Sequence, residues 1–320
     1  MKVLVTGAGG FIGGHLTKRL LKDGMFVIAV DKKPLSDWYQ VFSEADNFSL
    51  DLANLHNCET VVKECSWVFN LAADMGGMGF IENNKALCMI SVLINTNLLI
   101  ASKNASVEKY FFASSACVYA QDQQTSLDRN ISLKEVDAYP ADPEDGYGWE
   151  KLFSERMCRH FYEDYGLEVR IARYHNVYGP FGTYYGGREK APAAAARKVL
   201  EFRNKITNQI SIWGDGAQLR SFTYIDDCVD GTLKLMNSHF REPINIGSSE
   251  TISIQELYDC AAKICKVLDP EYIYDLTAPV GVRSRSSNNE LCLAQLGWEP
   301  KISVVEGMTK TLDWIAGQKN

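Results

Sequence analysis

The chain has 320 residues, of which 46% are hydrophobic and 23% charged, which is the composition of a globular protein with a large core. Its formal net charge of −7 leaves no basic field for nucleic acid or a membrane, so an anionic ligand would need a few well-placed cations. The nine cysteines form no CxxC pair and the five histidines show no metal-ligand spacing, which argues against a disulfide framework and a metal site.

The cellular setting is predicted from the same features. An odd number of cysteines favours a reducing, cytoplasmic environment in which most thiols pack as small apolar side chains. The first residues lead straight into a predicted strand, so we expect no signal peptide. The longest apolar run, CMISVLINTNLLIAS, is interrupted by Asn95, Thr96 and Asn97, and we expect no membrane-spanning segment.

Short β-rich runs alternate with helical patterns from the start of the chain. The predicted strands are KVLVT, FVIAV, FSLDL, WVFNLA, YFFASS and EVRIARY. The helical patterns between them cover about residues 11–22, 54–65, 81–104 and 148–166. This rhythm predicts an α/β fold, a Rossmann-like doubly wound parallel sheet with helices on both faces.

After residue 175 the alternation loosens. A helix is predicted at about 188–204, and the shorter segments ISIWGDG, SFTYIDD, INIGS and IYDL follow it. We therefore expect residues 1–175 to form a cofactor-binding Rossmann domain. Residues 176–320 would then form mainly a smaller α/β cap that binds the substrate, with some segments returning to the main domain.

The segment VLVTGAGGFIGGHL places Gly7, Gly10 and Gly13 between the first strand and the first helix. Glycines in this turn allow a tight bend, close approach of the backbone to a pyrophosphate, and close packing of helix on sheet. The predicted helix starts at Phe11, with Ile12 in its first turn, and would present free N–H groups to the phosphates. The first βα turn is therefore predicted to bind a dinucleotide.

Acidic residues follow the second and third predicted strands. Asp31 lies about 20 residues after the glycines, where a carboxylate can bind ribose hydroxyls and would repel a 2′-phosphate, so NAD is favoured over NADP. Lys32 and Lys33 could soften that choice, or they could be solvated surface lysines. Asp51, followed by Leu52, could contact the adenine or could cap a helix.

A possible oxidation centre lies in DGYGWEK, where Tyr147 and Lys151 are four residues apart and would share one face of a helix. A lysine one turn from a phenol lowers the pKa of the phenol, so that a tyrosinate can act as a base near neutral pH. Ser115 ends the strand YFFASS, which would bring its hydroxyl to the same edge of the sheet.

With these residues the chain resembles the extended short-chain dehydrogenase/reductase family. The glycine turn, Asp31, NLAA after the fourth strand, the serine strand and YxxxK occur in that family's order. The resemblance implies that NAD is bound, with Leu71 of NLAA at the cofactor. It also implies that Tyr147 takes a proton from the substrate hydroxyl, that Ser115 orients this hydroxyl, and that Lys151 binds the nicotinamide ribose.

Cys117 lies two residues after Ser115. Because residues i and i+2 of a strand face the same side, both side chains would look toward the cofactor cleft, although a buried structural cysteine is the alternative. Three further segments, NLAADMGGMGF, GGREKAPAA with Lys190, and WGDGAQLRSF, accompany it. Together with ASSAC, YHNVYGPFG, REPINIGS and GVRSRSSNN they resemble the GDP-mannose 3,5-epimerases.

This resemblance implies a specific chemistry. Oxidation of C4 of the hexose makes the protons on C3 and C5 acidic, because each carbon is then α to a ketone. Cys117 as base and Lys190 as acid would invert C5 and C3 from opposite faces, although the two could trade roles. Re-reduction at C4 then ends the cycle, so NAD would stay tightly bound and be recycled.

The resemblance also implies a binding site. The sugar would be bound by Gly76, Ser115, Cys117, Asn176, Glu189, Lys190 and Ala191. The nucleotide diphosphate would be held by Lys198, Gln218, Arg220 and Arg285, since cations and the guanidinium fork suit phosphate oxygens. Arg285 could instead be a surface cation with Arg283 in its place, and Tyr178, Tyr184 and Tyr185 could stack on the ligand or pack within the cap.

The expected reaction is the conversion of GDP-mannose to GDP-L-galactose and GDP-L-gulose. The alternatives are an NAD-dependent 4-epimerase, a C3/C5 epimerase of another GDP-hexose or GDP-heptose, or a protein that binds NAD only for redox sensing or as a scaffold. Cys117 and Lys190 distinguish the first reading, because a simple 4-epimerase does not need them. Apolar faces on helices 81–104 and 148–166, and the resemblance, imply a homodimer.

Overall fold

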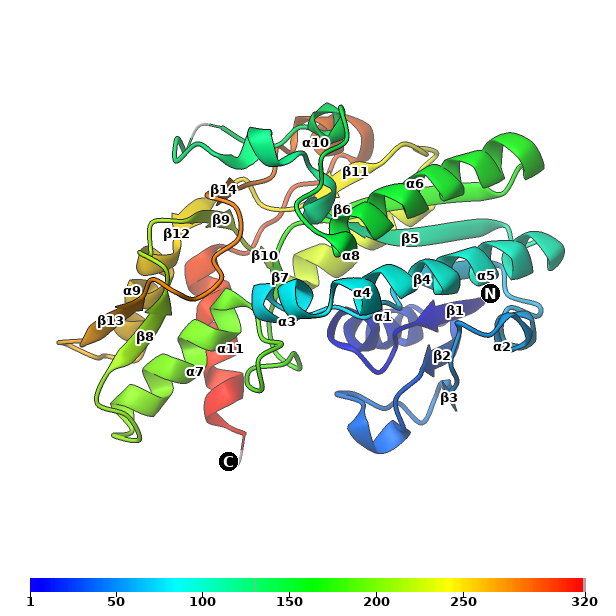
Figure 1. Ribbon diagram of the computed structural model, residues 1–320. Helices are drawn as coiled ribbons and strands as arrows, with labels where there is room; N and C mark the ends of the chain where they lie inside the picture. Colours follow the sequence, from blue (N-terminus) through cyan, green and yellow to red (C-terminus); the bar gives the residue numbers. More distant parts are fainter. Residues whose placement is uncertain (130, 319–320) are drawn as a thin grey trace.

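The computed structural model describes residues 1–129 and 131–318, and it is built around a seven-stranded sheet (Figure 1). The strand order is β11-β6-β5-β4-β1-β2-β3, and all neighbours are parallel. The strands are β1 (Lys2–Thr6), β2 (Phe26–Asp31), β3 (Asp46–Ser49), β4 (Trp67–Asn70), β5 (Lys109–Ser115), β6 (Glu168–Tyr174) and β11 (Ile244–Ile246). The order reverses between β1 and β4, so the carboxyl ends of these strands border the crevice where such sheets bind ligands.

Helices cover both faces of this sheet, because alternate strand residues are apolar toward each side. Val3 and Val5 share a buried cluster with α1 (Phe11–Lys22) and α8 (Ile225–Asn237). Leu4 belongs to a second cluster on the opposite face. That face is covered by α2 (Leu55–Val61), α5 (Val92–Asn104) and α6 (Gly146–Tyr165). The predicted doubly wound parallel sheet is confirmed.

The predicted helix over 81–104 is divided into α3 (Met78–Asn83), α4 (Lys85–Ile90) and α5. By length and composition alone, the stretch Lys85–Asn104 could cross a membrane, which the sequence analysis did not expect. Here the helix breaks at Ser91, and the buried Asn95 carbonyl accepts hydrogen bonds from Asn70 and from Tyr110. The stretch therefore serves as a covering element of the sheet in this structure.

The rest of the chain forms three small sheets and a helical layer at one end of the molecule (Figure 1). The strands are β7 (Val177–Tyr178), β8 (Ile210–Trp213), β9 (Leu219–Ser221), β10 (Thr223–Tyr224), β12 (Thr251–Ser253), β13 (Tyr272–Asp275) and β14 (Ser284–Arg285). The helical layer contains α7 (Ala191–Arg203), α9 (Ile254–Ile264) and α11 (Val304–Ala316), whereas α10 (Glu290–Leu296) lies beside β11 of the main sheet (Figure 1). Strand β11 pairs with β6 in the main sheet, while the domain division at residue 175 stays a prediction.

All nine cysteines lie in the described part of the chain, and all are free. Seven are buried, and Cys260 and Cys265 are partly buried. Burial raises the pKa of most of these thiols, for example to about 12 at Cys58 and to about 11 at Cys65. Such thiols stay protonated near neutral pH and act as small apolar groups.

Candidate active site

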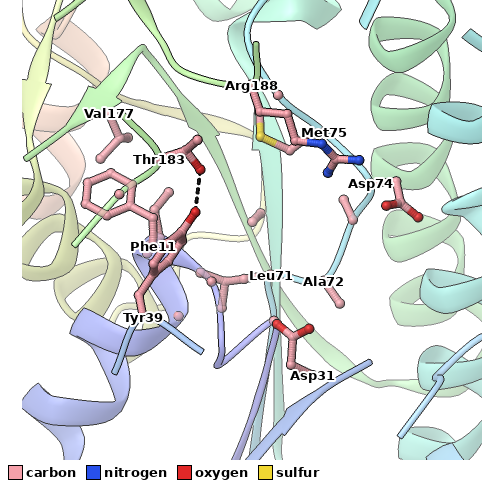
Figure 2. Close-up of a pocket in the computed structure, with 18 of the residues that line it drawn as sticks. Phe11, Asp31, Tyr39, Leu71, Ala72, Asp74, Met75, Val177, Thr183 and Arg188 are labelled. Carbon is pink, nitrogen blue, oxygen red and sulfur yellow. Dashed lines mark hydrogen bonds between the residues drawn. The ribbon is translucent and has the colours of Figure 1, made fainter. Parts of the chain in front are cut away.

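A groove of about 480 Å³ crosses the carboxyl ends of the central strands, and we call it the cofactor groove (Figure 2). Every residue that the sequence analysis assigned to the cofactor lines it. These residues are Gly7, Gly10, Phe11, Ile12, Gly13, Asp31, Asp51, Leu52, Leu71, Tyr147 and Lys151. The structure therefore brings the whole predicted cofactor set together.

The glycine turn has the geometry that a dinucleotide needs. Gly7 has a φ of +68°, a left-handed conformation that favours glycine. A Cβ atom on Gly13 would lie 2.1 Å from the carbonyl oxygen of Gly7, so the helix could not approach the strand. Gly10 caps α1 without a side-chain hydrogen bond, which leaves the first N–H groups of a long helix for an anion. These residues fit the pyrophosphate of NAD.

Two lysines beside Asp31 are already engaged. Lys32 forms a 2.6 Å ion pair with Asp74, and the Lys33 ammonium donates to the carbonyl of Gly9 at 2.8 Å. The backbone N–H of Lys33 also donates to the Asp31 carboxylate at 3.0 Å. Lys32 is a surface lysine, with a side chain that is 52% exposed, whereas Lys33 is partly buried. The preference for ribose hydroxyls over a 2′-phosphate comes from Asp31, whose carboxylate would repel the phosphate.

The predicted third strand is shifted, because β3 ends at Ser49 rather than at Leu52. The Asp51 carboxylate accepts a hydrogen bond from the backbone of Ala53 at 2.9 Å and closes a turn there. The cap of α2 is Asn54, whose side chain accepts from the backbone of His56. Asp51 therefore lines the groove but is not the helix cap.

A contact that sequence reasoning missed joins two walls of the cofactor groove. The hydroxyl of Tyr39, in the segment after β2, hydrogen-bonds to the hydroxyl of Thr183, in the loop before α7 (Figure 2). Lys33 lies 4.9 Å from the centre of the Tyr39 ring. We call this contact the Tyr39–Thr183 clasp. The segment around Tyr39 has no periodic pattern, so nothing in the sequence indicated a partner 144 residues away.

The oxidation centre lies where α6 begins. Asp145 caps this helix by accepting from the backbone of Gly148 at 2.8 Å, which places Tyr147 in the first turn and Lys151 one turn later. The Lys151 ammonium is 5.5 Å from the centre of the Tyr147 ring. Ser115 ends β5, and its hydroxyl is hydrogen-bonded to Tyr147. Tyr147, Lys151 and Ser115 therefore lie close together, as predicted.

The expected lowering of the pKa of Tyr147 is not found. Burial raises the pKa of this phenol well above its usual range, Cys117 and Glu150 add to the rise, and the hydrogen bond with Ser115 opposes it. Lys151 does not offset the burial, since its ammonium pairs with Glu150 at 3.5 Å and lies over the ring of Phe112. The phenol is therefore neutral in this structure.

A second cavity of about 280 Å³ adjoins the groove, and we call it the substrate cavity. Every residue that the sequence analysis assigned to the substrate lines it. These residues are Gly76, Ser115, Cys117, Asn176, Glu189, Lys190, Ala191, Lys198, Gln218, Arg220 and Arg285. Six residues line both spaces, namely Met75, Gly76, Ser115, Tyr147, Tyr174 and Lys190. The two spaces therefore meet at the oxidation centre.

Cys117 does not lie in a strand. Strand β5 ends at Ser115, and Ala116–Val118 form a single 3₁₀ turn in which the N–H of Cys117 donates to the Ser115 hydroxyl at 3.2 Å. The predicted shared strand face is therefore wrong. Both residues still line the substrate cavity, and α6 packs directly on this turn. A Cβ atom on Gly148 would lie 2.2 Å from the carbonyl of Cys117.

Arg285 contacts the Cys117 thiol. One terminal nitrogen, Nη1, lies 3.2 Å from the sulfur, Nε donates to Gln124 at 2.6 Å, and Nη2 lies 3.4 Å from the Glu144 carboxylate. Arg285 is 6% exposed, so the reading of it as a surface cation is wrong. Its rival Arg283 pairs instead with Asp215 at the surface. The assignment of Arg285 to the diphosphate stays a prediction.

Lys190 immediately precedes α7 and lines both spaces. Desolvation has the largest effect on its ammonium and lowers the pKa. The interaction with Cys117 raises this pKa, and the like charge of Arg285, a smaller effect, lowers it. Burial thus makes the Lys190 ammonium a stronger acid than an exposed lysine, which suits the predicted role of Lys190 as acid. Cys117 and Lys190 come from different elements, the turn after β5 and the residue before α7.

Three other predicted residues line the far part of the substrate cavity. The Lys198 ammonium donates to the carbonyl of Ser211 at 2.7 Å, and burial lowers its pKa. The side-chain carbonyl of Gln218 is buried and has no hydrogen-bond partner among the described residues. Desolvation and the charge of Arg285 lower the pKa of Arg220 to about 9, although backbone carbonyls accept its N–H groups.

The remaining predicted residues shape the cavity wall. Asn176 has a left-handed φ of +42° and donates to the carbonyl of Ser221, and Glu189 pairs with Arg197 at 3.2 Å. The three tyrosines pack within the protein. Tyr178 is buried, lines the cofactor groove and donates to Val304. Tyr184 packs edge-on against Trp314, and the exposed Tyr185 packs against Tyr184, so stacking of these rings on a ligand stays a prediction.

The fold and the site define an NAD-dependent short-chain dehydrogenase-type enzyme of the extended class. Residues 3–247 match the NAD dependent epimerase/dehydratase family, and the chain belongs to that family. It is 45% identical to GDP-mannose 3,5-epimerase 1 of Oryza sativa subsp. indica, covering 99% of this chain and 82% of the relative. The GDP-mannose 3,5-epimerase of Arabidopsis thaliana is also 45% identical, with 99% and 83% covered.

A solved structure agrees with this assignment. The UDP-glucose 4-epimerase of Thermus thermophilus in complex with NAD superposes with a TM-score of 0.83 at 25% identity, over 99% of both chains. The predicted fold class, the resemblance to GDP-mannose 3,5-epimerases and the use of NAD are confirmed.

Proposed function

We propose that this protein is an epimerase that converts GDP-mannose to GDP-L-galactose, with GDP-L-gulose as a second product. One observation carries the proposal: a thiol, Cys117, and an amine, Lys190, line a cavity that opens onto the oxidation centre at Tyr147. The identity of 45% with two GDP-mannose 3,5-epimerases over nearly the whole chain supports the choice of substrate.

The first stage of the reaction takes place where the two spaces meet. NAD, when bound, supplies a hydride acceptor for C4 and a positive ring charge that offsets the burial of the Tyr147 phenolate. Ser115 donates a hydrogen bond that orients the C4 hydroxyl, and Tyr147 takes the proton of that hydroxyl. Lys151 is placed one turn along α6, where its ammonium can bind ribose hydroxyls.

The second stage uses Cys117 and Lys190. With a ketone at C4, loss of the proton on C5 leaves an electron pair that is delocalised onto the carbonyl oxygen. The Cys117 thiolate takes this proton from one face, and the Lys190 ammonium returns a proton to the same carbon from the opposite face. Once Cys117 has released its proton to solvent and Lys190 has taken one up, the same exchange inverts C3. The cofactor, when bound, would supply the hydride for C4, and Tyr147 returns the proton that it took from the C4 hydroxyl.

The far part of the cavity suits a nucleotide diphosphate. Lys198 and Arg220 supply positive charge in a chain whose net charge is negative, and cations of this kind bind phosphate oxygens. The buried carbonyl of Gln218 lacks a partner among the described residues and fits an N–H or O–H donor of the ligand. These contacts support binding of the GDP moiety here.

We also infer a homodimer. Neighbouring helices α4, α5 and α6 expose apolar side chains, each at least 40% accessible, namely Leu87, Met89, Ile90, Leu93, Trp149 and Phe153. A second copy would bury this surface by packing the same helices together. Light scattering should give twice the mass of the chain, and Phe153→Glu should give the monomer mass.

We infer a reducing, cytoplasmic setting for this protein. The nine free cysteines support this setting.

The reaction is tested by incubating the purified protein with GDP-mannose in D₂O and recording NMR spectra of the sugar. We expect GDP-L-galactose to form and deuterium to appear at C5 and C3. Cys117→Ala should abolish the exchange and still allow transient reduction of NAD. Absence of deuterium at both carbons, or inversion at C4 alone, would show that the protein is not a 3,5-epimerase.

A further inference from the structure

Two side chains outside the proposed reaction, Gln124 and Glu144, hold the guanidinium of Arg285. Arg285 uses a different nitrogen for each neighbour: Nε for Gln124 at 2.6 Å, Nη1 for the Cys117 sulfur at 3.2 Å, and Nη2 for Glu144 at 3.4 Å. Because the guanidinium is planar and rigid, fixing one nitrogen fixes the direction of the others. The position of Arg285 against the thiol is therefore set by its neighbours.

Gln124 can hold this position because its own orientation is fixed. The residue is 1% exposed, and its amide nitrogen donates to the backbone carbonyls of Tyr119 at 3.0 Å and of Ala120 at 3.1 Å. Both amide N–H groups are thus used, and the side-chain carbonyl is left for Nε of Arg285. Rotating the amide would cost these bonds, so Gln124 presents an acceptor to Arg285 in one direction only.

Charged and titratable groups from several elements surround Cys117. Arg285 comes from β14, Arg220 from β9, Lys190 from the start of α7, Tyr147 from α6 and Glu144 from the segment before α6. The thiol of Cys88, from α4, packs in the same buried cluster, and burial raises its pKa. Among these groups, Arg285 donates directly to the sulfur. A cation in contact with the sulfur favours the thiolate, whereas the Glu144 carboxylate neutralises part of that cation.

We propose that Gln124 and Glu144 are positioning residues that control the ionisation of Cys117 in opposite directions through Arg285. Gln124 holds the guanidinium at the sulfur and so promotes the thiolate. The Glu144 carboxylate lies at Nη2, on the other side of the guanidinium from the sulfur, and offsets part of its positive charge. Glu144 therefore disfavours the thiolate form of Cys117. The use of this thiolate in epimerisation depends on the proposed function, whereas its ionisation can be measured without any substrate.

The experiment measures how fast iodoacetamide alkylates Cys117 in the NAD-loaded protein as a function of pH, with the modified peptide quantified by mass spectrometry. Glu144→Gln keeps the size of the side chain and removes its charge, so the midpoint of the profile should fall by about one pH unit. Gln124→Met should raise the midpoint by a similar amount. The matched control is Gln123→Met, at an exposed neighbouring position, and its profile should coincide with that of the wild type.

Glu144→Gln decides the outcome, because Gln124→Met also leaves two buried carbonyls unpaired and could destabilise the fold. An unchanged midpoint in Glu144→Gln, or a shift to higher pH, would overturn the proposal. The pH profile of deuterium exchange at C5 should shift in the same direction as the alkylation profile. If the wild type exchanges no deuterium, the proposed reaction fails; if it does exchange and Glu144→Gln has the wild-type alkylation profile, this inference fails alone.

Discussion

The cofactor groove and the substrate cavity meet at the same six residues, yet they are built in different ways. The groove is formed largely by backbone, with Gly7, Gly10 and Gly13 allowing a strand, a turn and a helix to approach one another. The cavity is formed by partly or fully buried charged side chains, among them Lys190, Arg220 and Arg285, from segments far apart in the chain. The fit of a ligand in the groove therefore depends largely on backbone shape, whereas the cavity depends on the charges of its side chains.

This difference predicts how each region responds to change. In the groove, a single added methyl group meets a backbone atom that cannot move aside. In the cavity, burial lowers the pKa of Lys190 and that of Arg220, and the charge of Arg285 acts on both. Loss or gain of one charge there should therefore change the pKa values of neighbouring groups. Steric variants should disturb the first region and charge variants the second.

The largest effect is expected for Tyr147→Phe, because Tyr147 serves both regions. Removal of the phenol should slow both NAD reduction and proton exchange by on the order of a thousandfold. Cys117→Ala provides the contrast, since Cys117 lines only the substrate cavity; it should slow exchange at C5 and leave NAD reduction intact. Both rates can be followed with GDP-mannose, one by nicotinamide absorbance and one by NMR. If Cys117→Ala abolished reduction too, the two regions would not be functionally separable.

The next effect tests the backbone construction of the groove. Gly13→Ala would place a Cβ atom 2.1 Å from the Gly7 carbonyl, so we expect NAD affinity to fall by at least about tenfold and the Tm to drop. Gly14→Ala is the control, because its nearest neighbour is the flexible side chain of Gln40 at 3.0 Å. Calorimetric titration with NAD measures both. Equal affinities in the two variants would contradict the steric explanation.

A pH effect on stability tests the buried polar groups near the cavity. Burial lowers the pKa of His175 to about 3, from 6.5 in the unfolded chain, so the folded state keeps it neutral where the unfolded state takes up a proton. Stability from this group is complete above pH 6.5 and is lost as pH falls toward 3, at about 1.4 kcal/mol per unit. Urea unfolding between about pH 6.5 and 5 should show this slope. In His175→Gln the slope should be smaller by that amount, whatever the absolute stability.

The smallest effect concerns the Tyr39–Thr183 clasp. Tyr39→Phe keeps the ring beside Lys33 and removes only the hydroxyl that bonds to Thr183. Because an exposed hydrogen bond contributes about 1 kcal/mol, NAD should dissociate several-fold faster. Stopped-flow release of the cofactor measures this rate. A rate equal to that of the wild type would show that the clasp does not retain the cofactor.

The sequence predicted the fold and the members of both spaces, because their signals are short and contiguous. The glycine turn, Asp31 and YxxxK are each local signals, and every residue assigned to the cofactor or to the substrate lines one of the two spaces. What the sequence could not predict depends on contacts between distant segments. The three partners of Arg285 are 141, 161 and 168 residues away, and α6 packs closely on the 3₁₀ turn at Cys117.

The pKa of Tyr147 was mispredicted for a related reason. Spacing alone placed a lysine one turn from the phenol, and this placement is correct. Spacing could not reveal that Glu150 accompanies Lys151 into the interior or that the phenol is fully enclosed. Desolvation and a neighbouring carboxylate, both properties of the packed protein, outweigh the local pair.

The wall common to the two spaces limits how the enzyme can be re-engineered. Met75, Gly76 and Tyr174 line both the cofactor groove and the substrate cavity. A substitution at one of them therefore changes the binding of the dinucleotide and of the sugar together. Asn176, Glu189 and Ala191, which are predicted to contact the sugar, line the substrate cavity and not the groove. A variant library aimed at a different hexose should therefore begin at these three positions and leave the shared wall untouched.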